Sequence, residues 1–115
     1  MFANPLNFVV INASDECANE LATLIGRSHP GSIVKTYDQN GTLPAADLYI
    51  IDTKGMQDSR LEYFLDGSLD TPYLLIIDNI REYSRYREHL QGRREAVLRT
   101  DLGGMSFVNS LHHLI

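Results

Sequence analysis

Five short apolar runs alternate with segments whose apolar residues follow helical spacing, and this alternation narrows the possible folds more than any other feature of the chain. The third run, DLYIID, is almost continuously apolar, which is typical of a strand buried on both faces of a parallel sheet. Strands that alternate with helices predict right-handed crossovers and the strand order 2-1-3-4-5. The expected fold is therefore a flavodoxin-like, three-layer α/β/α domain with strands at 6–12, 32–37, 47–52, 73–77 and 96–100.

Four helices are expected to cover this sheet. Ser14 occupies an N-cap position before the first helix, and Pro30 and Gly31 should stop that helix. Only nine residues separate Tyr37 from Asp47, so the second crossover should be abridged to at most about one helical turn. Helical spacing predicts three further inward faces, formed by Leu61, Phe64 and Leu65 on a helix at 58–67, by Ile80, Tyr83, Tyr86 and Leu90 before Gly92, and by Phe107, Leu111 and Leu114.

Length and composition set the class of protein. A chain of 115 residues is one domain, and the single cysteine, Cys17, cannot form an internal disulfide. The N-terminal segment lacks the basic region of a signal peptide, and no stretch approaches the roughly 18 apolar residues of a membrane helix. These features predict a cytoplasmic protein without membrane contact. The net charge of −5 argues against general binding to a nucleic-acid backbone.

Asp52 ends the third run and is the first candidate for a functional residue. Open parallel sheets bind their ligands beyond the carboxyl ends of the strands, so this carboxylate should face such a crevice. The chain has no glycine-rich phosphate loop and no Cys/His cluster of the kind that binds zinc. His112 and His113 are neighbours on a predicted helix and diverge by about 100°, so they do not easily share one metal.

The run DLYIID, together with the number of strands and their spacing, resembles the receiver domains of bacterial response regulators. The resemblance covers nearly the whole chain and places Asp52 at the family's phosphorylated aspartate. The family's two Mg²⁺-binding acidic residues fall on Asn12 and Ala13. Its switch Ser or Thr falls on Ile77, with Asp78 directly after, and its lysine falls on Arg99.

These departures imply an atypical or pseudo-receiver that is not an enzyme and needs no cofactor. Asp15 and Asp52 alone would bind Mg²⁺ weakly, and Mg²⁺ would matter only if Asp52 is phosphorylated. Asp78 should repel a phosphoryl group. We expect Arg99 to form a bidentate ion pair with Asp52 and to fill the space that a phosphate would need.

The short second crossover, the segment IIDTKGMQ and the Gly-Gly pair before the last helix resemble the N-terminal domains of LuxR-type regulators of biofilm matrix. The resemblance implies a single receiver-like domain, 1–115, from a longer regulator that would contact DNA only through a C-terminal domain. It also implies a homodimer or a regulatory protein partner, on a face expected to include Arg81, Arg85, Arg99 and His112. Two alternatives remain open, namely a receiver phosphorylated on Asp52 and a sensor of small molecules such as cyclic dinucleotides.

Overall fold

The sheet of this protein has five parallel strands in the order β2-β1-β3-β4-β5. The computed structural model describes residues 5–37, 42–65, 70–90 and 92–115. The strands are β1 (Asn7–Ile11), β2 (Ile33–Tyr37), β3 (Leu48–Asp52), β4 (Tyr73–Ile77) and β5 (Arg94–Leu98). The predicted strand order is confirmed.

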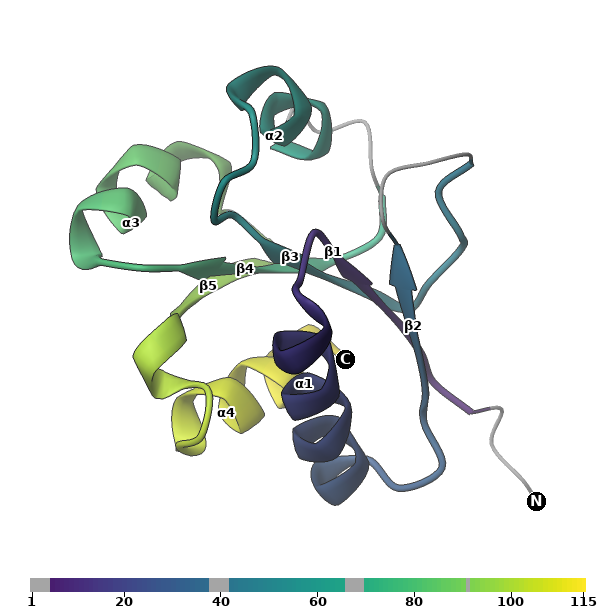
Figure 1. The fold of residues 1–115 in the computed structure, drawn as a ribbon. Helices are drawn as coiled ribbons and strands as arrows, with labels where there is room; N and C mark the ends of the chain where they lie inside the picture. The colour runs from purple at the N-terminus through teal and green to yellow at the C-terminus, as the bar shows by residue number, and fades with distance from the viewer. Residues whose placement is uncertain (1–4, 38–41, 66–69, 91) are drawn as a thin grey trace.

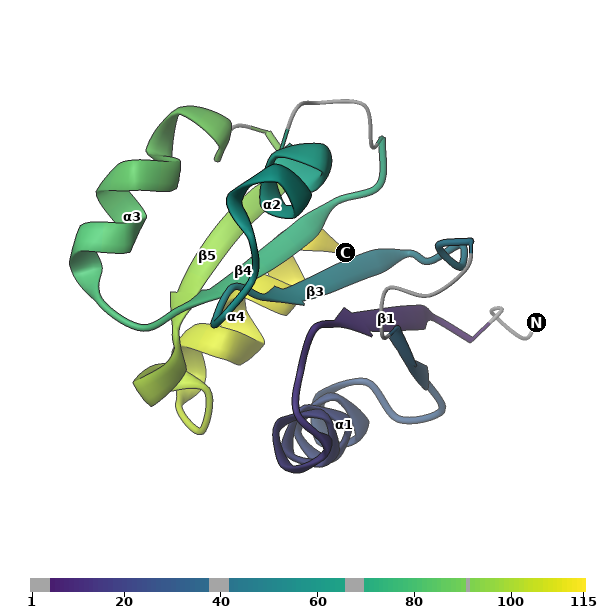
Figure 2. The same cartoon turned by 45° about the horizontal axis from the view of Figure 1, so that its top comes forward.

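Two helices cover each face of the sheet (Figure 1). The first face carries α1 (Asp15–Ser28) and α4 (Met105–Leu114), and the opposite face carries α2 (Asp58–Leu65) and α3 (Ile80–Tyr86). Figure 2 shows α2 and α3 together on one side of the sheet and α1 on the other. The protein therefore has the predicted flavodoxin-like α/β/α architecture.

Side chains that alternate along the central strands form two hydrophobic cores. Ile50 and Leu74 point into the core shared with α1 and α4, whereas Ile51 and Leu75 point into the core shared with α2 and α3. All four are fully buried. A strand with period-two side chains needs apolar residues at every position when both faces are covered, which explains the continuous apolar runs.

The ends of α1 confirm the sequence signals at both termini. The Ser14 Oγ accepts a hydrogen bond from the Cys17 N–H at 3.2 Å, which is the N-cap interaction expected of serine. The helix ends at Ser28, and the C-cap residue His29 separates it from Pro30 and Gly31. The second crossover is short as predicted, since its described residues, 42–47, contain no helix. The predicted end of α2 at Gly67 lies outside the described residues.

Two predicted elements differ from the structure. The fifth strand spans Arg94–Leu98 rather than 96–100, because the backbone turns into a 3₁₀ helix at Arg99–Asp101. Arg94 is accommodated in this edge strand with its guanidinium carbon 5.4 Å from the ring centroid of Tyr73, its partner in register.

The helix expected to continue to Gly92 ends earlier than predicted. α3 stops at Tyr86 and is followed by a 3₁₀ turn, Arg87–His89. Of its predicted apolar face, Tyr86 is buried, but Ile80 and Tyr83 are 68% and 41% exposed. No helix in the described part of the chain is both long enough and apolar enough to cross a membrane.

Candidate functional site

The carboxyl ends of β1, β3 and β4 and the turn after β5 converge on Asp52. Asp52 is the last residue of β3 and is only 4% exposed. A carboxylate buried to this degree needs a charged partner or several hydrogen bonds, because removing it from water is costly. The surrounding contacts supply both.

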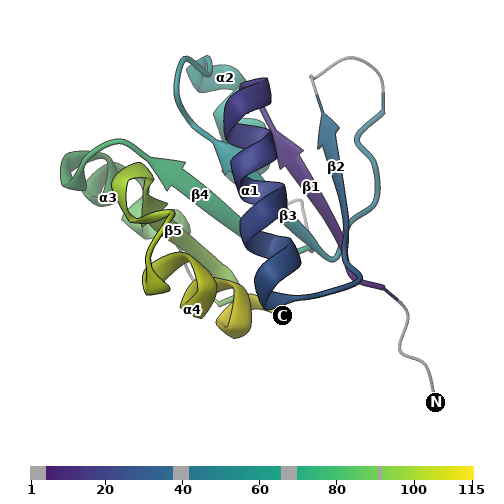
Figure 3. The same ribbon diagram turned by 60° about the horizontal axis from the view of Figure 1, so that its bottom comes forward.

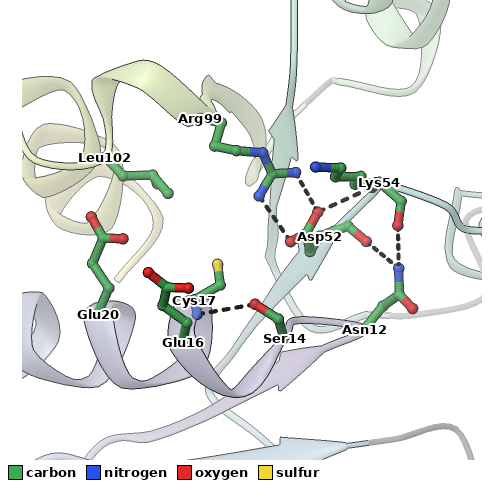
Figure 4. A pocket seen from close by; sticks show the side chains of 9 residues that line it. All are labelled: Asn12, Ser14, Glu16, Cys17, Glu20, Asp52, Lys54, Arg99 and Leu102. Atoms are coloured by element: carbon green, nitrogen blue, oxygen red, sulfur yellow. Dashed lines mark hydrogen bonds and ion pairs between the residues drawn. The ribbon is translucent and has the colours of Figure 1, made fainter.

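Arg99 binds both carboxylate oxygens of Asp52 (Figure 4). Its Nη1 donates to Asp52 Oδ2 at 2.9 Å, and its Nη2 donates to Asp52 Oδ1 at 2.6 Å. The backbone N–H of Lys54 also donates to Oδ1, at 3.0 Å. The bidentate pair predicted from the sequence is confirmed, and both oxygens of Asp52 are engaged.

A second carboxylate completes the arrangement around Arg99. Asp78, the residue directly after β4, accepts a hydrogen bond from Arg99 Nε at 2.7 Å. Hydrogen bonds to Asp52 and then to Asp78 raise the pKa of the Arg99 guanidinium above its ordinary value, against the opposing effect of burial. Arg99 therefore stays charged at any pH in which the fold survives, and one cation neutralises part of the charge of two carboxylates.

The local backbone explains how Arg99 reaches this position. β5 ends at Leu98, and the 3₁₀ turn Arg99–Asp101 redirects the chain toward α4. Arg99 thus lies just beyond β5, at the same edge of the sheet as Asp52 and Asp78. Asp52 is the last residue of β3, and Asp78 directly follows β4. The predicted strand 96–100 would have placed Arg99 within the strand rather than in the turn beyond it.

Asn12 is a structural residue of the site. It adopts a left-handed backbone conformation with φ of 65°, which asparagine tolerates better than most residues. Its side-chain Nδ2 donates to the backbone carbonyls of Asp52 at 2.8 Å and Lys54 at 3.1 Å. The amide therefore ties the end of β1 to the loop after β3.

The other positions assigned by the receiver resemblance carry no polar chemistry. Ala13 is half-buried and packs against the core beneath α1. Ile77 ends β4 as predicted, is almost fully buried, and belongs to the core beneath α2 and α3. The positions of the family's two acidic residues and of its Ser or Thr are therefore filled by one amide and two apolar side chains.

A cavity of about 390 Å³ lies beside the ion pair. Its walls come from β1, the first turns of α1, the end of β3 and the turn after β5 (Figure 4). The lining residues are Asn12, Ser14, Glu16, Cys17, Glu20, Asp52, Lys54, Arg99 and Leu102. Burial and then the nearby charge of Asp52 raise the pKa of the Cys17 thiol above its ordinary value. Cys17 is therefore protonated at neutral pH.

The remaining predicted residues lie outside this cavity. Asp15 begins α1, is exposed, and is not among the lining residues. The described residues contain no group of three or more His, Cys, Asp or Glu side chains placed to hold a metal ion. Arg81 and Arg85 are exposed on α3, whereas His112 lies on α4 against His29 at the end of α1. The predicted partner-face residues thus come from α3, the turn after β5 and α4.

Lys54, Glu16 and Glu20 were not expected to line the site. Glu16 and Glu20 are four residues apart in a predicted helix and therefore share one helix face with Cys17. That these three side chains lie close together could have been predicted from the sequence. Which way that face points depends on packing of α1 against the sheet. For Lys54 the sequence holds no such signal.

Because comparisons with known proteins found no match, a proposal about function rests on the fold and on the geometry around Asp52. No family model, no curated protein and no solved structure matches the chain.

Proposed function

We propose that this protein is a regulatory, receiver-like domain of a bacterial transcription regulator that acts by dimerisation or by docking a partner, without phosphorylation. The flavodoxin-like fold and the position of Asp52 support the resemblance to receivers. The bidentate ion pair between Asp52 and Arg99 is the observation that supports a function without phosphorylation.

Phosphorylation of an aspartate requires a carboxylate oxygen that can attack phosphorus and a cation that neutralises the transferred group. Both oxygens of Asp52 are held by Arg99, and Asp78 adds a second negative charge within reach of the same guanidinium. A phosphoryl donor would have to displace Arg99, and the neutral residues Asn12 and Ala13 replace the acidic pair that would bind Mg²⁺. The site favours a standing ion pair over a phosphoryl adduct.

Exposed side chains on α3 support the docking role. Ile80 and Tyr83 are large apolar residues left in solvent, and Arg81 and Arg85 flank them. Aromatic and arginine side chains are enriched where proteins bind one another. Contact with DNA would belong to a C-terminal domain of the regulator and not to this acidic domain.

The decisive experiment treats the protein with acetyl phosphate, and separately with beryllofluoride, in the presence of Mg²⁺. Intact mass and oligomeric state are measured before and after, with Asp52→Asn as the matched control. We expect no phosphoryl adduct and an unchanged oligomeric state. A stoichiometric adduct that is absent in Asp52→Asn would refute the proposal and favour a receiver phosphorylated on Asp52.

The cavity beside the ion pair favours one other candidate, a sensor of small molecules. In the described part of the chain, Lys54 presents an ammonium group without an ion-pair partner to this cavity, and Ser14 adds a hydroxyl. A ligand that binds only the folded state raises the melting temperature. Thermal unfolding in saturating nucleotides and cyclic dinucleotides tests this candidate, and an unchanged melting temperature in all of them would count against it.

A further inference from the structure

Two histidines from distant parts of the chain meet at the far end of the first helical layer. α1 and α4 run side by side on one face of the sheet (Figure 3). His29 is the C-cap of α1, and His112 lies in the last turn of α4. Their ring centroids are 5.0 Å apart, with 42° between the ring planes. Neither residue lines the cavity at Asp52.

The ring of His29 is held in place by its surroundings. The Ser28 hydroxyl lies 3.3 Å from the carbonyl oxygens of Leu24 and Ile25, to which it donates. A hydrogen bond of 2.9 Å also joins the Ser28 Oγ and the His29 ring nitrogen Nδ1. The edge of the ring also packs against Phe8, whose ring centroid is 6.2 Å away.

This hydrogen bond engages Nδ1 of His29, so Nε2 is the ring nitrogen that remains for a metal ion. In the tautomer with the proton on Nδ1, Ser28 accepts and the lone pair of the ring is on Nε2. Histidines that bind metals commonly donate their second ring N–H to a neighbouring oxygen in this way.

The separation of the two rings matches two imidazoles on one ion. With a metal–nitrogen distance of about 2.1 Å, each ring centroid lies about 3.2 Å from the metal. Two such ligands at angles between about 90° and 110° have centroids about 4.5 to 5.2 Å apart. The observed 5.0 Å falls within this range.

We propose that His29 and His112 form a two-histidine binding site for a divalent transition metal ion, such as Zn²⁺ or Ni²⁺, with water in the remaining coordination positions. Imidazole nitrogen is a preferred ligand of these ions. Because the described residues offer no third protein ligand here, the site leaves coordination positions open. A bound ion would link the C-terminal ends of α1 and α4.

The test uses tag-free protein freed of metal with EDTA and titrated with Zn²⁺ and Ni²⁺ in a calorimeter. We expect saturable binding of one ion per chain and a higher melting temperature with the ion. His112→Ala should weaken binding at least tenfold. This variant is informative because His112 is exposed on α4 and its removal leaves the core intact.

His113→Ala is the matched control. His113 is on the same helix, is 72% exposed and faces Glu95, with 3.7 Å between its Nδ1 and a Glu95 carboxylate oxygen. It should bind metal as the unchanged protein does. Wild-type affinity in His112→Ala, or an equal loss in His113→Ala, would overturn the proposal. Imidazole ¹⁵N spectra give an independent reading, since Zn²⁺ should shift Nε2 of His29 and leave the His89 signals unchanged.

Discussion

The buried carboxylate of Asp52 has Arg99 as its charged partner, and one backbone N–H also donates to it. Removal of one partner of a buried ion pair strands the other charge. We expect Arg99→Met to lower the free energy of unfolding by about 2 kcal/mol or more, with the partial exposure of Arg99 reducing the full effect. Asp52→Asn should cost less, about 1 kcal/mol, since Arg99 keeps Asp78 as a partner. Urea unfolding measures both.

A matched control is Arg87→Met, which removes an exposed arginine from the 3₁₀ turn after α3. Its urea midpoint should equal that of the unchanged protein. If Asp52→Asn proved more destabilising than Arg99→Met, the stranded-charge account of this pair would be wrong.

The thiol of Cys17 gives a second residue-scale prediction. Burial and the charge of Asp52 raise its pKa, and only the thiolate reacts with iodoacetamide. The alkylation rate at neutral pH should therefore be lower than that of a free thiol, and its rise with pH should be displaced to higher pH. Asp52→Asn removes one of the raising charges and leaves the opposing charge of Arg99, so the rise should move to lower pH. An unchanged profile in Asp52→Asn would contradict this electrostatic explanation.

Residue pairings were only partly predictable from the sequence. Asp52 and Arg99 could be paired in advance because the resemblance to receivers placed Arg99 at the lysine that pairs with the family's phosphorylated aspartate. The contact between Asp78 and Arg99 Nε depends on the 3₁₀ turn that begins at Arg99, and a strand pattern that continued through Thr100 concealed that turn. Asp78 was expected to repel phosphate, but its contact in the structure is with the guanidinium.

Among the helices, α1 and α3 share an N-cap arrangement but differ in burial. Ser14 caps α1, and Asn79 Oδ1 accepts from the backbone N–H groups of Arg81 and Glu82 in α3. α1 anchors Leu21 and Ile25 in the core, whereas α3 buries only Tyr86. An element with few buried contacts can open without unfolding of the whole domain.

We therefore expect the two cap deletions to act differently. Ser14→Ala should lower global stability by about 1 kcal/mol, because α1 cannot separate from the core without global unfolding. Asn79→Ala should mainly accelerate amide hydrogen exchange in α3, with a smaller change in the global urea midpoint. Exchange rates resolved by residue and urea unfolding distinguish these outcomes. Equal global losses would show that α3 is as firmly anchored as α1.

The apolar face of α3 shows why the length of this helix could not be predicted from the sequence. Ile80, Tyr83 and Tyr86 do lie at helical spacing, and the helix exists where the pattern placed it. Periodicity identifies which residues share a face, but whether neighbouring elements cover that face depends on tertiary packing. Only the Tyr86 end of α3 reaches the core, and a 3₁₀ turn follows the helix from Arg87.

At the scale of the whole molecule, the sheet and the limits of four of its strands were predictable to within one residue, whereas the limits of β5 were not. The continuous apolar runs in DLYIID and YLLII required cover on both faces of the sheet. The segments between most of the strands have room for one right-handed crossover each. The edge strand β5 was predicted two residues too late, and its one buried side chain, Val97, is flanked by half-buried residues. Edge strands carry a weaker apolar signal for this reason.

The two hydrophobic cores on opposite faces of the sheet should contribute independently to the free energy of unfolding, but they should unfold in one transition. Ile50 and Ile51 are neighbours in β3, are both fully buried, and point into different cores. Ile50→Val and Ile51→Val should each lower the free energy of unfolding by about 1 kcal/mol, because each removes one buried methyl group. Their side chains share no core, so the double variant should lose the sum of the two within about 0.5 kcal/mol.

A single cooperative transition is expected in all three of these proteins, since β1, β3 and β4 contribute to both cores and neither helical layer can detach without exposing the sheet. Urea unfolding followed by both circular dichroism and tyrosine fluorescence measures the sum and the cooperativity together. If Ile51→Val produced two separated transitions, or if the double variant lost much more than the sum, the helices α2 and α3 and their core would behave as a separate unit. Coincident transitions with additive losses would mean that the central strands join both layers into one folding unit.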